Sequence, residues 1–317
     1  MNNLLMTFNP KAKEKSKLPD FVRNAQFDNP ETYEFSQELI NAVNVAVYLG
    51  QPLLVTGEPG TGKTQLANAI AHFYGLEKPL VFNTKTTSTA KDLLYSYDSL
   101  AHFQYVQTNN EPLLPKDIEQ KFIRYQALGE ALRRNDKRYV VLFDEIDKAP
   151  RDLPNDILDV LEKMEFEVAE LTEYDNNGNK KVKKIAAQEK FRPIVIMTSN
   201  SEKNLPDAFL RRCVFFHIKF PEEQLKTILK LKILGKDYSN EEWNALVEHF
   251  LDIRKKLKRK KPATSELILW TKILHEANFN FLNLKDINNT STEEKNILRM
   301  SYSVLAKNRD DLELLTI

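Results

Sequence analysis

Residues Gly57–Thr64 read GEPGTGKT, a glycine-rich stretch that ends in a lysine and a threonine. The apolar run Pro52–Val55 precedes it, and apolar residues recur behind it at helical spacing, namely Leu66, Ala69, Ile70 and Phe73. This order predicts a buried strand, a glycine loop and an amphipathic helix. In such a loop the backbone N–H groups turn inward and the helix N-terminus adds its positive dipole end, so we expect a site for phosphate groups.

The side chains of this loop suit a nucleoside triphosphate. Lys63 is placed to reach the β- and γ-phosphates, and the hydroxyl of Thr64 is placed to ligate Mg²⁺. No NKxD guanine-recognition motif is present, which argues against a GTPase. The expected cofactors are Mg²⁺, from the Thr64 hydroxyl, and ATP, which the family resemblance given below implies. The expected cofactor contacts are Gly57, Glu58, Pro59, Gly60, Thr61, Gly62, Lys63 and Thr64.

Polar side chains end two further apolar runs. Asp144 and Glu145 follow the run Val140–Phe143, and Asn200 follows Ile194–Thr198. Beside the phosphate loop, Asp144 can hold the Mg²⁺ shell, Glu145 can polarise the attacking water, and the Asn200 amide can donate to a phosphate oxygen. The structural alternatives are an acidic pair at a helix N-terminus and an asparagine turn or cap.

Two adjacent arginines, Arg211 and Arg212, precede the strand-like run Val214–Ile218. Such a pair can act as an arginine finger, which reaches the γ-phosphate bound by a neighbouring subunit and stabilises the transition-state charge. The alternative is a pair of surface ion pairs. If the finger assignment is right, the subunit interface is part of the active site.

Composition limits the class of protein. The 317 residues carry 46 basic and 45 acidic side chains and one cysteine. A charge near zero argues against a chain that mainly wraps phosphate backbones, and one cysteine cannot form an intrachain disulfide. No apolar run approaches the length of a membrane-spanning helix, so we expect a soluble cytoplasmic protein with no membrane span.

The periodicity of the chain changes at about residue 220. We expect a polar arm over residues 1–30, an α/β domain with a parallel sheet over 31–220, and a small all-helical domain over 221–317. The stretch 166–188 contains Asn177-Gly178 between alternating segments, which predicts a β-hairpin. A polar loop is the alternative for that stretch.

The chain resembles the AAA+ P-loop ATPases, and within them the MoxR-like branch. The resemblance covers about residues 30–290, through GEPGTGKTQLA, DEIDKAPRDLPNDIL, TSNSEKNLPDAFLRRC and KPATSEL. It implies an α/β nucleotide-binding domain with a helical lid, a homo-oligomeric ring that is typically hexameric, and ATP hydrolysis coupled to remodelling or maturation of protein clients, as in a chaperone. A partner with a von Willebrand factor A domain is also implied.

The resemblance assigns roles to the residues above. It makes Gly57–Thr64 the Walker A element, Asp144 and Glu145 the Walker B pair, and Asn200 sensor 1. The finger is Arg212 first and Arg211 second. In the lid, Ser265 stands where the family has a sensor 2 arginine, while Thr84–Asp98 and the 166–188 hairpin correspond to insertions around the ring pore. These segments either contact the client or only brace the core.

Two other functions are compatible with parts of the sequence. A nucleic-acid-dependent AAA+ NTPase, such as an initiator, a clamp loader or a restriction-associated protein, is supported only by the basic run Arg254–Lys261. A basic run at the end of a helix also complements the helix dipole and stays in solvent, so we expect no nucleic-acid partner. A P-loop kinase would have no use for Asn200 and the arginine pair.

Overall fold

The computed structural model describes residues 29–109, 113–174, 179–201, 205–233 and 235–315. The contacts divide the chain into two compact units. The α/β unit comprises Phe35–Gly57 and Lys63–Ile218. The helical unit runs from Lys219 onward and also includes Glu58–Gly62 and the described residues up to Glu34. The expected N-terminal arm lies almost entirely outside the described residues.

A parallel sheet forms the centre of the α/β unit. Among the described residues it has five strands in the order β2-β5-β8-β1-β9. The strands are β1 (Leu53–Gly57), β2 (Leu80–Asn83), β5 (Val140–Asp144), β8 (Ile194–Ser199) and β9 (Val214–Ile218), and every pair is parallel. The inner strands are almost continuously apolar because helices cover the sheet. The predicted α/β class is confirmed.

Helices connect these strands and pack against the sheet. Helix α1 (Gln37–Leu49) contacts β1 and β9, α2 (Lys63–Phe73) contacts β1, β5 and β8, and α6 (Ala127–Arg133) contacts β2 and β5. The Ser36 hydroxyl caps α1 by accepting the Leu39 N–H, and Gly50 ends the helix in the left-handed conformation at φ 62°. The shorter helices are α7 (Leu153–Asp156), α8 (Leu158–Lys163) and α9 (Asp207–Leu210).

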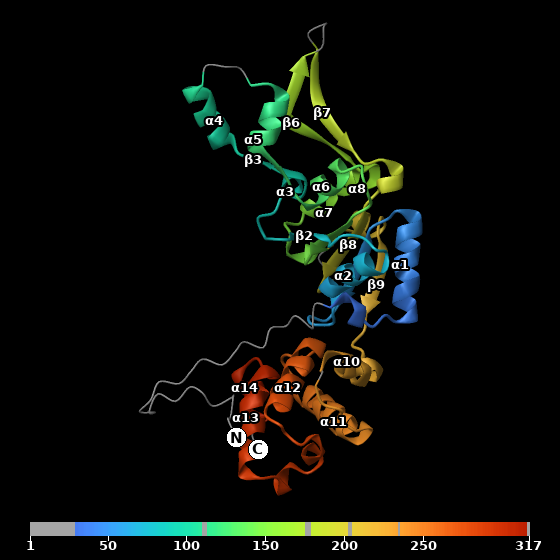
Figure 1. Ribbon diagram of the computed structural model, residues 1–317, viewed down its shortest axis with the longest axis vertical. Coiled ribbons are helices and arrows are strands. Elements are labelled where there is room, and N and C mark those ends of the chain that lie inside the picture. The colour runs from blue at the N-terminus through green and yellow to red at the C-terminus, as the bar shows by residue number, and fades with distance from the viewer. Residues whose placement is uncertain (1–28, 110–112, 175–178, 202–204, 234, 316–317) are drawn as a thin grey trace. The chain divides into compact units, whose positions relative to one another are not determined.

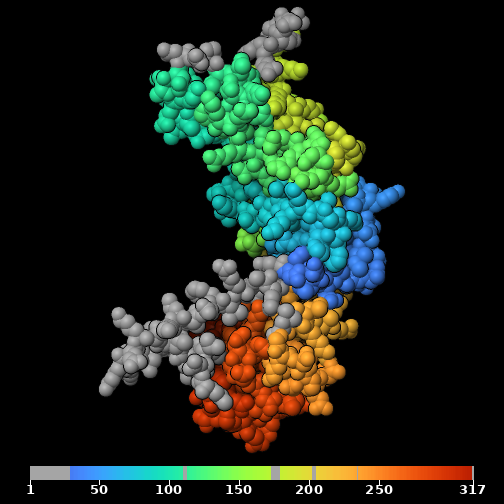
Figure 2. Space-filling model, in the orientation of Figure 1, coloured from blue at the N-terminus to red at the C-terminus, as the bar shows by residue number. Residues whose placement is uncertain are grey.

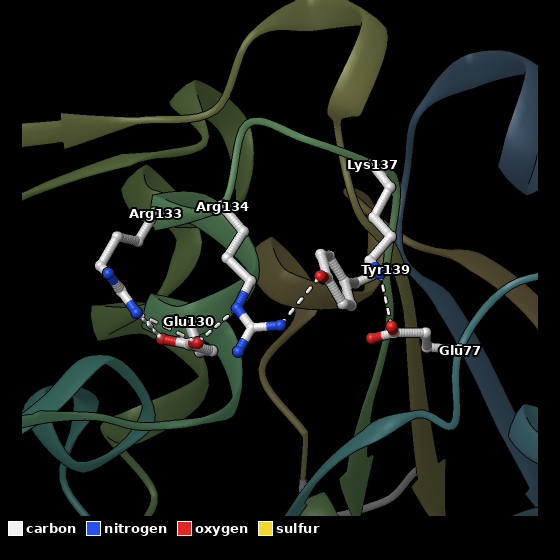
Figure 3. Close-up of polar contacts among 6 residues, drawn as sticks. All are labelled: Glu77, Glu130, Arg133, Arg134, Lys137 and Tyr139. Atoms are coloured by element: carbon white, nitrogen blue, oxygen red, sulfur yellow. Dashed lines mark hydrogen bonds and ion pairs between the residues drawn. The ribbon is translucent and has the colours of Figure 1, made fainter.

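Polar contacts tie the end of α6 to the start of β5 (Figure 3). Arg134 pairs with Glu130 at 2.5 Å and donates to the Tyr139 hydroxyl at 3.0 Å. Both contacts raise the pKa of the Arg134 guanidinium, the one with Tyr139 most. Lys137 pairs with Glu77, which precedes β2. The segment that leads into β5 is therefore held in place before the strand begins.

A group of elements that we call the insertion projects from one end of the sheet (Figure 1). It consists of α3 (Ala90–Leu94), β3 (Tyr95–Tyr97), α4 (Ser99–Thr108), α5 (Pro115–Phe122), β4 (Ile123–Tyr125), β6 (Glu165–Tyr174) and β7 (Lys180–Ala186). Strands β6 and β7 are antiparallel, so the predicted hairpin is confirmed, although its turn at 175–178 lies outside the described residues. The ribbon β3–β4 is antiparallel too.

Two clusters, each made of one glutamate, one tyrosine and one lysine, connect the hairpin to the β3–β4 ribbon. In the first, Glu170 of β6 accepts a hydrogen bond from the Tyr95 hydroxyl at 2.8 Å and pairs with Lys91 at 2.6 Å. The second joins the carboxylate of Glu119 to Tyr125 and Lys183. The two tyrosines are cross-strand partners in the ribbon. The insertion is therefore braced from both sides.

The helical unit has a core of its own. Its helices are α10 (Leu225–Lys232), α11 (Asn240–Lys256), α12 (Thr264–Glu276), α13 (Thr292–Ser301) and α14 (Arg309–Glu313). Trp270 is fully buried, and its indole N–H donates to the Ser301 hydroxyl at 2.9 Å. His249 stacks against Trp270 and Tyr302. Within the described part of the chain, no helix has both the length and the apolar content to cross a bilayer.

Candidate active site

The predicted phosphate loop connects β1 to α2. Strand β1 ends at Gly57 and α2 begins at Lys63. Gly60 and Gly62 have φ of 80° and 88°, a left-handed conformation that side chains disfavour, which explains why glycine occupies both positions. Between them, the Thr61 hydroxyl donates to the Glu58 carbonyl at 2.8 Å and closes the turn.

Lys63 joins this loop to strand β8. Its ammonium group donates to the Gly57 carbonyl at 2.8 Å and to Oδ1 of Asn200 at 2.9 Å, and the residue is buried. The side chain predicted for phosphate contact and the side chain predicted as a sensor are therefore in direct contact, although 137 positions separate them. A buried ammonium group with oxygen partners is well placed to exchange one of them for a phosphate oxygen.

Thr64 and Asp144 meet at the edge of the sheet. The Thr64 hydroxyl donates to Oδ1 of Asp144 at 3.0 Å. Among the described residues there is no group of three or more His, Cys, Asp or Glu side chains that could hold a metal ion. One hydroxyl and one carboxylate nevertheless suit Mg²⁺, which takes hard oxygen ligands and is commonly held by one or two carboxylates together with substrate phosphates. The residues present fit a nucleotide-bound Mg²⁺.

Glu145 leaves strand β5 in an unusual backbone conformation. Its φ is 56°, in the left-handed region that non-glycine residues seldom occupy. Its Oε1 accepts from the Asn200 side-chain amide at 3.3 Å, and its Oε2 pairs with Lys148. This pairing raises the pKa of Lys148. The Glu145 side chain remains 38% exposed, so water can reach the carboxylate.

Three polar residues of this cluster were not predicted from the sequence. Thr198 donates to Asp144 at 2.6 Å, Asp147 accepts the Asn200 backbone N–H at 3.2 Å, and Lys148 pairs with Glu145. Thr198 stands at the end of an apolar run, where a threonine also suits a strand for packing reasons alone. Asp147 could have been predicted from the sequence, because it is an acid that stands only two positions after Glu145, near the same edge of the sheet.

The two arginines follow Asn200 closely in the sequence, but neither has a polar contact with this cluster in the described residues. Arg212 donates to the Ala208 carbonyl at 3.0 Å and lies 3.6 Å from the Glu162 carboxylate. The side chain of Arg211 is exposed and has no polar partner among the described residues. Neither arginine completes the Lys63 cluster within one described chain.

The basic run at the end of α11 differs from the expectation at its first residue. Arg254 is buried, donates to the Pro262 carbonyl at 2.6 Å and pairs with Glu58 at 2.6 Å. It also lies over the Phe220 ring, 3.7 Å from the centroid. The prediction that the whole run stays in solvent was wrong for Arg254, because its buried guanidinium has a carbonyl, a carboxylate and an aromatic ring as partners. Ser265 donates to Glu266 at 2.8 Å.

Several solved structures match the chain at low identity and with TM-scores below 0.5. For a threonine-to-valine variant of RuvB from Thermotoga maritima, the TM-score is 0.44 at 13% identity, over 84% of this chain and 74% of that one. For a putative ATPase from Cytophaga hutchinsonii, the TM-score is 0.38 at 15% identity, over 89% of this chain and 84% of that one. For the Thermotoga maritima RuvB Holliday junction branch migration motor, the TM-score is 0.42 at 13% identity, over 84% of this chain and 76% of that one. No curated protein matches the sequence.

One family profile matches the sequence over residues 52–213, which is more than half of the chain. The profile describes the AAA domain of the dynein-related subfamily. The matched region begins one residue before β1 and ends one residue before β9, so it contains the predicted phosphate loop, Asp144, Glu145 and Asn200. The chain therefore belongs to the AAA domain family, dynein-related subfamily.

Proposed function

We propose that the protein is an Mg²⁺-dependent ATPase that converts ATP and water to ADP and phosphate. One observation carries the proposal: Lys63, Asn200 and Glu145 form a continuous chain of hydrogen bonds beside the Thr64–Asp144 contact. Phosphoryl transfer needs a cation for the phosphates, a carboxylate for the water and oxygen ligands for a metal, all close together. The cluster supplies each of these groups at the carboxyl end of a parallel sheet.

Each residue has a task in this mechanism. Lys63 and the loop N–H groups bind and orient the β- and γ-phosphates, and Thr64 and Asp144 would hold Mg²⁺, which neutralises phosphate charge when bound. Glu145 accepts a proton from the attacking water, and Asn200 orients that water or the γ-phosphate. Catalysis consists of positioning and electrostatics, with no covalent enzyme intermediate.

Lys63→Ala and Glu145→Gln separate binding from hydrolysis. We expect Lys63→Ala to weaken ATP binding, because it removes the ammonium group that faces the phosphates. Glu145→Gln should keep ATP bound and lower kcat by about 10²- to 10⁴-fold, since the amide cannot act as a base. Binding of a fluorescent ATP analogue and phosphate release measure the two effects. Parental turnover in Glu145→Gln would contradict the assignment of the water-activating group.

We infer that the active site is completed by a second copy of the chain. Arg211 and Arg212 do not reach the Lys63 cluster in the described chain, so either of them can stabilise a γ-phosphate only from a neighbouring subunit. Because Arg212 is engaged by Glu162 and Ala208 in its own subunit, we propose Arg211 as the finger. A closed ring, typically a hexamer in MoxR-like proteins, provides this arrangement at every interface.

We propose further that ATP hydrolysis remodels protein clients, and that helix α4 of the insertion contacts them. Leu100, Phe103 and Val106 recur along α4 and are 66%, 61% and 57% exposed. The opposite face is anchored, because His102 stacks on Phe122 with 4.7 Å between the ring centroids. Figure 2 shows the α4 and α5 residues as one surface beside the hairpin. Apolar side chains gathered on one exposed helix face can serve as a site of protein interaction.

The occupant of this face is an apolar segment of a client protein. Helix α4 carries no Asp, Glu, Lys or Arg, so its partner requires no particular charge. The three side chains expose on the order of 300 Å², well below the about 800 Å² that each partner contributes to a stable interface. A lasting dimer through this face is therefore disfavoured, whereas a short and reversible contact with an unfolded segment fits.

A double substitution tests the client contact. We expect Leu100→Ser with Phe103→Ser to weaken binding of a labelled, permanently unfolded polypeptide by at least about tenfold, because burial of each side chain contributes about 2 kcal/mol. Tyr48→Ser on α1 removes another highly exposed aromatic residue and serves as the control. Fluorescence anisotropy measures binding. Unchanged affinity, or a loss of self-association instead, would contradict the proposed occupant.

The remaining features of the proposal come from the MoxR-like resemblance. They are membership of the MoxR-like branch, action as a chaperone in the cytoplasm, and cooperation with a protein that bears a von Willebrand factor A domain. Copurification of such a protein with the tagged chain from its native cell tests the last of these.

A further inference from the structure

We propose that Thr198 is a positioning residue for both Walker B acids, an inference that rests on the proposed ATPase function. Thr198 lies in β8 and is fully buried. Its hydroxyl donates to Oδ1 of Asp144 at 2.6 Å and accepts the backbone N–H of Glu145 at 2.8 Å. One side chain therefore contacts the two acids that have different tasks in the mechanism.

The position of Thr198 follows from where the strand pairing stops. The β5–β8 ladder ends at the pair Phe143 and Met197, so the next residue on β8 faces the point where β5 ends. Glu145 leaves the strand at φ 56°, and its N–H turns to the Thr198 side chain rather than to a backbone carbonyl. A hydroxyl at this point replaces the missing ladder bond and satisfies the partly buried N–H of Glu145.

The hydroxyl also fixes the direction of the Asp144 carboxylate. Oδ1 of Asp144 accepts from Thr198 and from Thr64, so that two elements of the fold orient this oxygen. A carboxylate that ligates a metal is usually oriented by such a partner, whose loss lowers metal affinity or activity by about 10- to 100-fold. The Thr198 hydroxyl has one proton, which it donates to Asp144. The lone pairs of its oxygen remain to accept the Glu145 N–H.

The hydroxyl can be removed without changing the shape of the side chain. Thr198→Val keeps the branched volume and deletes both hydrogen bonds, whereas Thr198→Ser keeps the hydroxyl and loses a methyl group. We expect Thr198→Val to lower kcat by about 10- to 100-fold and to raise the Mg²⁺ concentration for half-maximal activity. Thr198→Ser should keep kcat and the Mg²⁺ concentration for half-maximal activity within about threefold of the parent, because only the hydroxyl matters in this role.

Three controls separate positioning from general damage. Thr271→Val removes another fully buried hydroxyl, in α12, and should leave kcat unchanged. Binding of a fluorescent ATP analogue in EDTA, which does not involve Asp144 as a metal ligand, should stay at the parental level in Thr198→Val. Thr198→Ala provides a second hydroxyl deletion if the valine variant unfolds, and near-ultraviolet circular dichroism reports the fold of each.

The outcomes distinguish this inference from the proposed function. A parent protein that hydrolyses no ATP contradicts the proposed function itself. A parent that hydrolyses ATP, together with hydroxyl-deleted variants of equal kcat and equal Mg²⁺ dependence, overturns the role of Thr198 alone. Equal losses in the serine, valine and alanine variants with no change in Mg²⁺ dependence also overturn it, because packing would then explain the effect.

Discussion

Oδ1 of Asp144 and the side chain of Glu145 occupy different electrostatic surroundings, although the residues are adjacent. The Asp144 oxygen accepts hydroxyl protons from Thr64 and Thr198, which orient it without adding charge. The Glu145 carboxylate instead faces the Lys148 ammonium and the Asn200 amide. The neutral partners suit the metal-ligand role proposed for Asp144, and the exposed Lys148 cation suits the proposed role of Glu145, whose carboxylate has to reach water.

His249 makes the stability of the helical unit depend on pH. Burial lowers its pKa to about 4, while the unfolded chain retains a value of about 6.5. Between these values the unfolded state binds more protons, so the free energy of unfolding falls as the pH decreases through this window. The expected loss from this group between pH 7 and pH 5 is about 2 kcal/mol. Urea unfolding at both pH values measures it.

His249→Phe removes the titrating ring and keeps the stack with Trp270 and Tyr302. The difference in the free energy of unfolding between pH 7 and pH 5 should be smaller by about 2 kcal/mol in this variant. His72 is exposed on α2, and His72→Gln should leave the difference as it is in the parent. An unchanged pH dependence in His249→Phe would show that this histidine is not the group responsible.

The strands of the sheet were largely predictable, and the insertion was not. Strands β1, β5, β8 and β9 begin and end within two residues of the apolar runs, because strands covered on both faces need continuous apolar sequence. Strands β3 and β4 have three residues each, too few for a period to show. Helix α4 has no buried residue, so burial imposed no pattern on its sequence. The insertion owes its form to contacts such as the Glu170 cluster.

The contact between α3 and α6 depends on the absence of a side chain at Gly129. A Cβ atom at this position of α6 would lie 1.8 Å from the Leu94 carbonyl oxygen, which is backbone and cannot move aside alone. We expect Gly129→Ala to destabilise the α/β unit by about 1–3 kcal/mol or more, although alanine favours helices. Thermal unfolding measures this. A stabilised Gly129→Ala variant would show that the two segments are further apart.

The predicted site residues fall into two groups in the chain as a whole. Gly57, Lys63, Thr64, Asp144, Glu145 and Asn200 meet through the sheet, since the carboxyl ends of its parallel strands share one edge. The sequence could predict this group because a parallel sheet brings those ends together. The arginines could not be placed from one chain, because the target proposed for them belongs to another copy.

Mixing two inactive variants tests whether the site is shared. The double substitution Arg211→Ala with Arg212→Ala leaves the nucleotide site intact, and Lys63→Ala leaves the arginines intact. Alone, each variant should release phosphate at least about 10³-fold more slowly than the parent at the same ATP concentration, the first for lack of the arginine and the second for lack of bound ATP. Mixed and reassembled, they should regain ATPase activity, because the arginine of one subunit can then serve the site of its neighbour. Phosphate release measures the recovery.

An inactive mixture is the outcome that would contradict a shared site, and the single variants show which arginine is the finger. A mixture as inactive as its components would contradict completion of the site by a neighbour. The single substitutions Arg211→Ala and Arg212→Ala then identify the finger, and the larger loss of kcat is expected for Arg211, as Arg212 already pairs with Glu162.

The left-handed backbone at Glu145 has a consequence for anyone who engineers this protein for heat resistance. Asparagine or glycine tolerates φ 56° better than glutamate, by about 1 kcal/mol. A search that rewards melting temperature alone would therefore select replacements at this position early. The hardier proteins that result would lack the carboxylate assigned to water activation, so this position has to be excluded from any such screen.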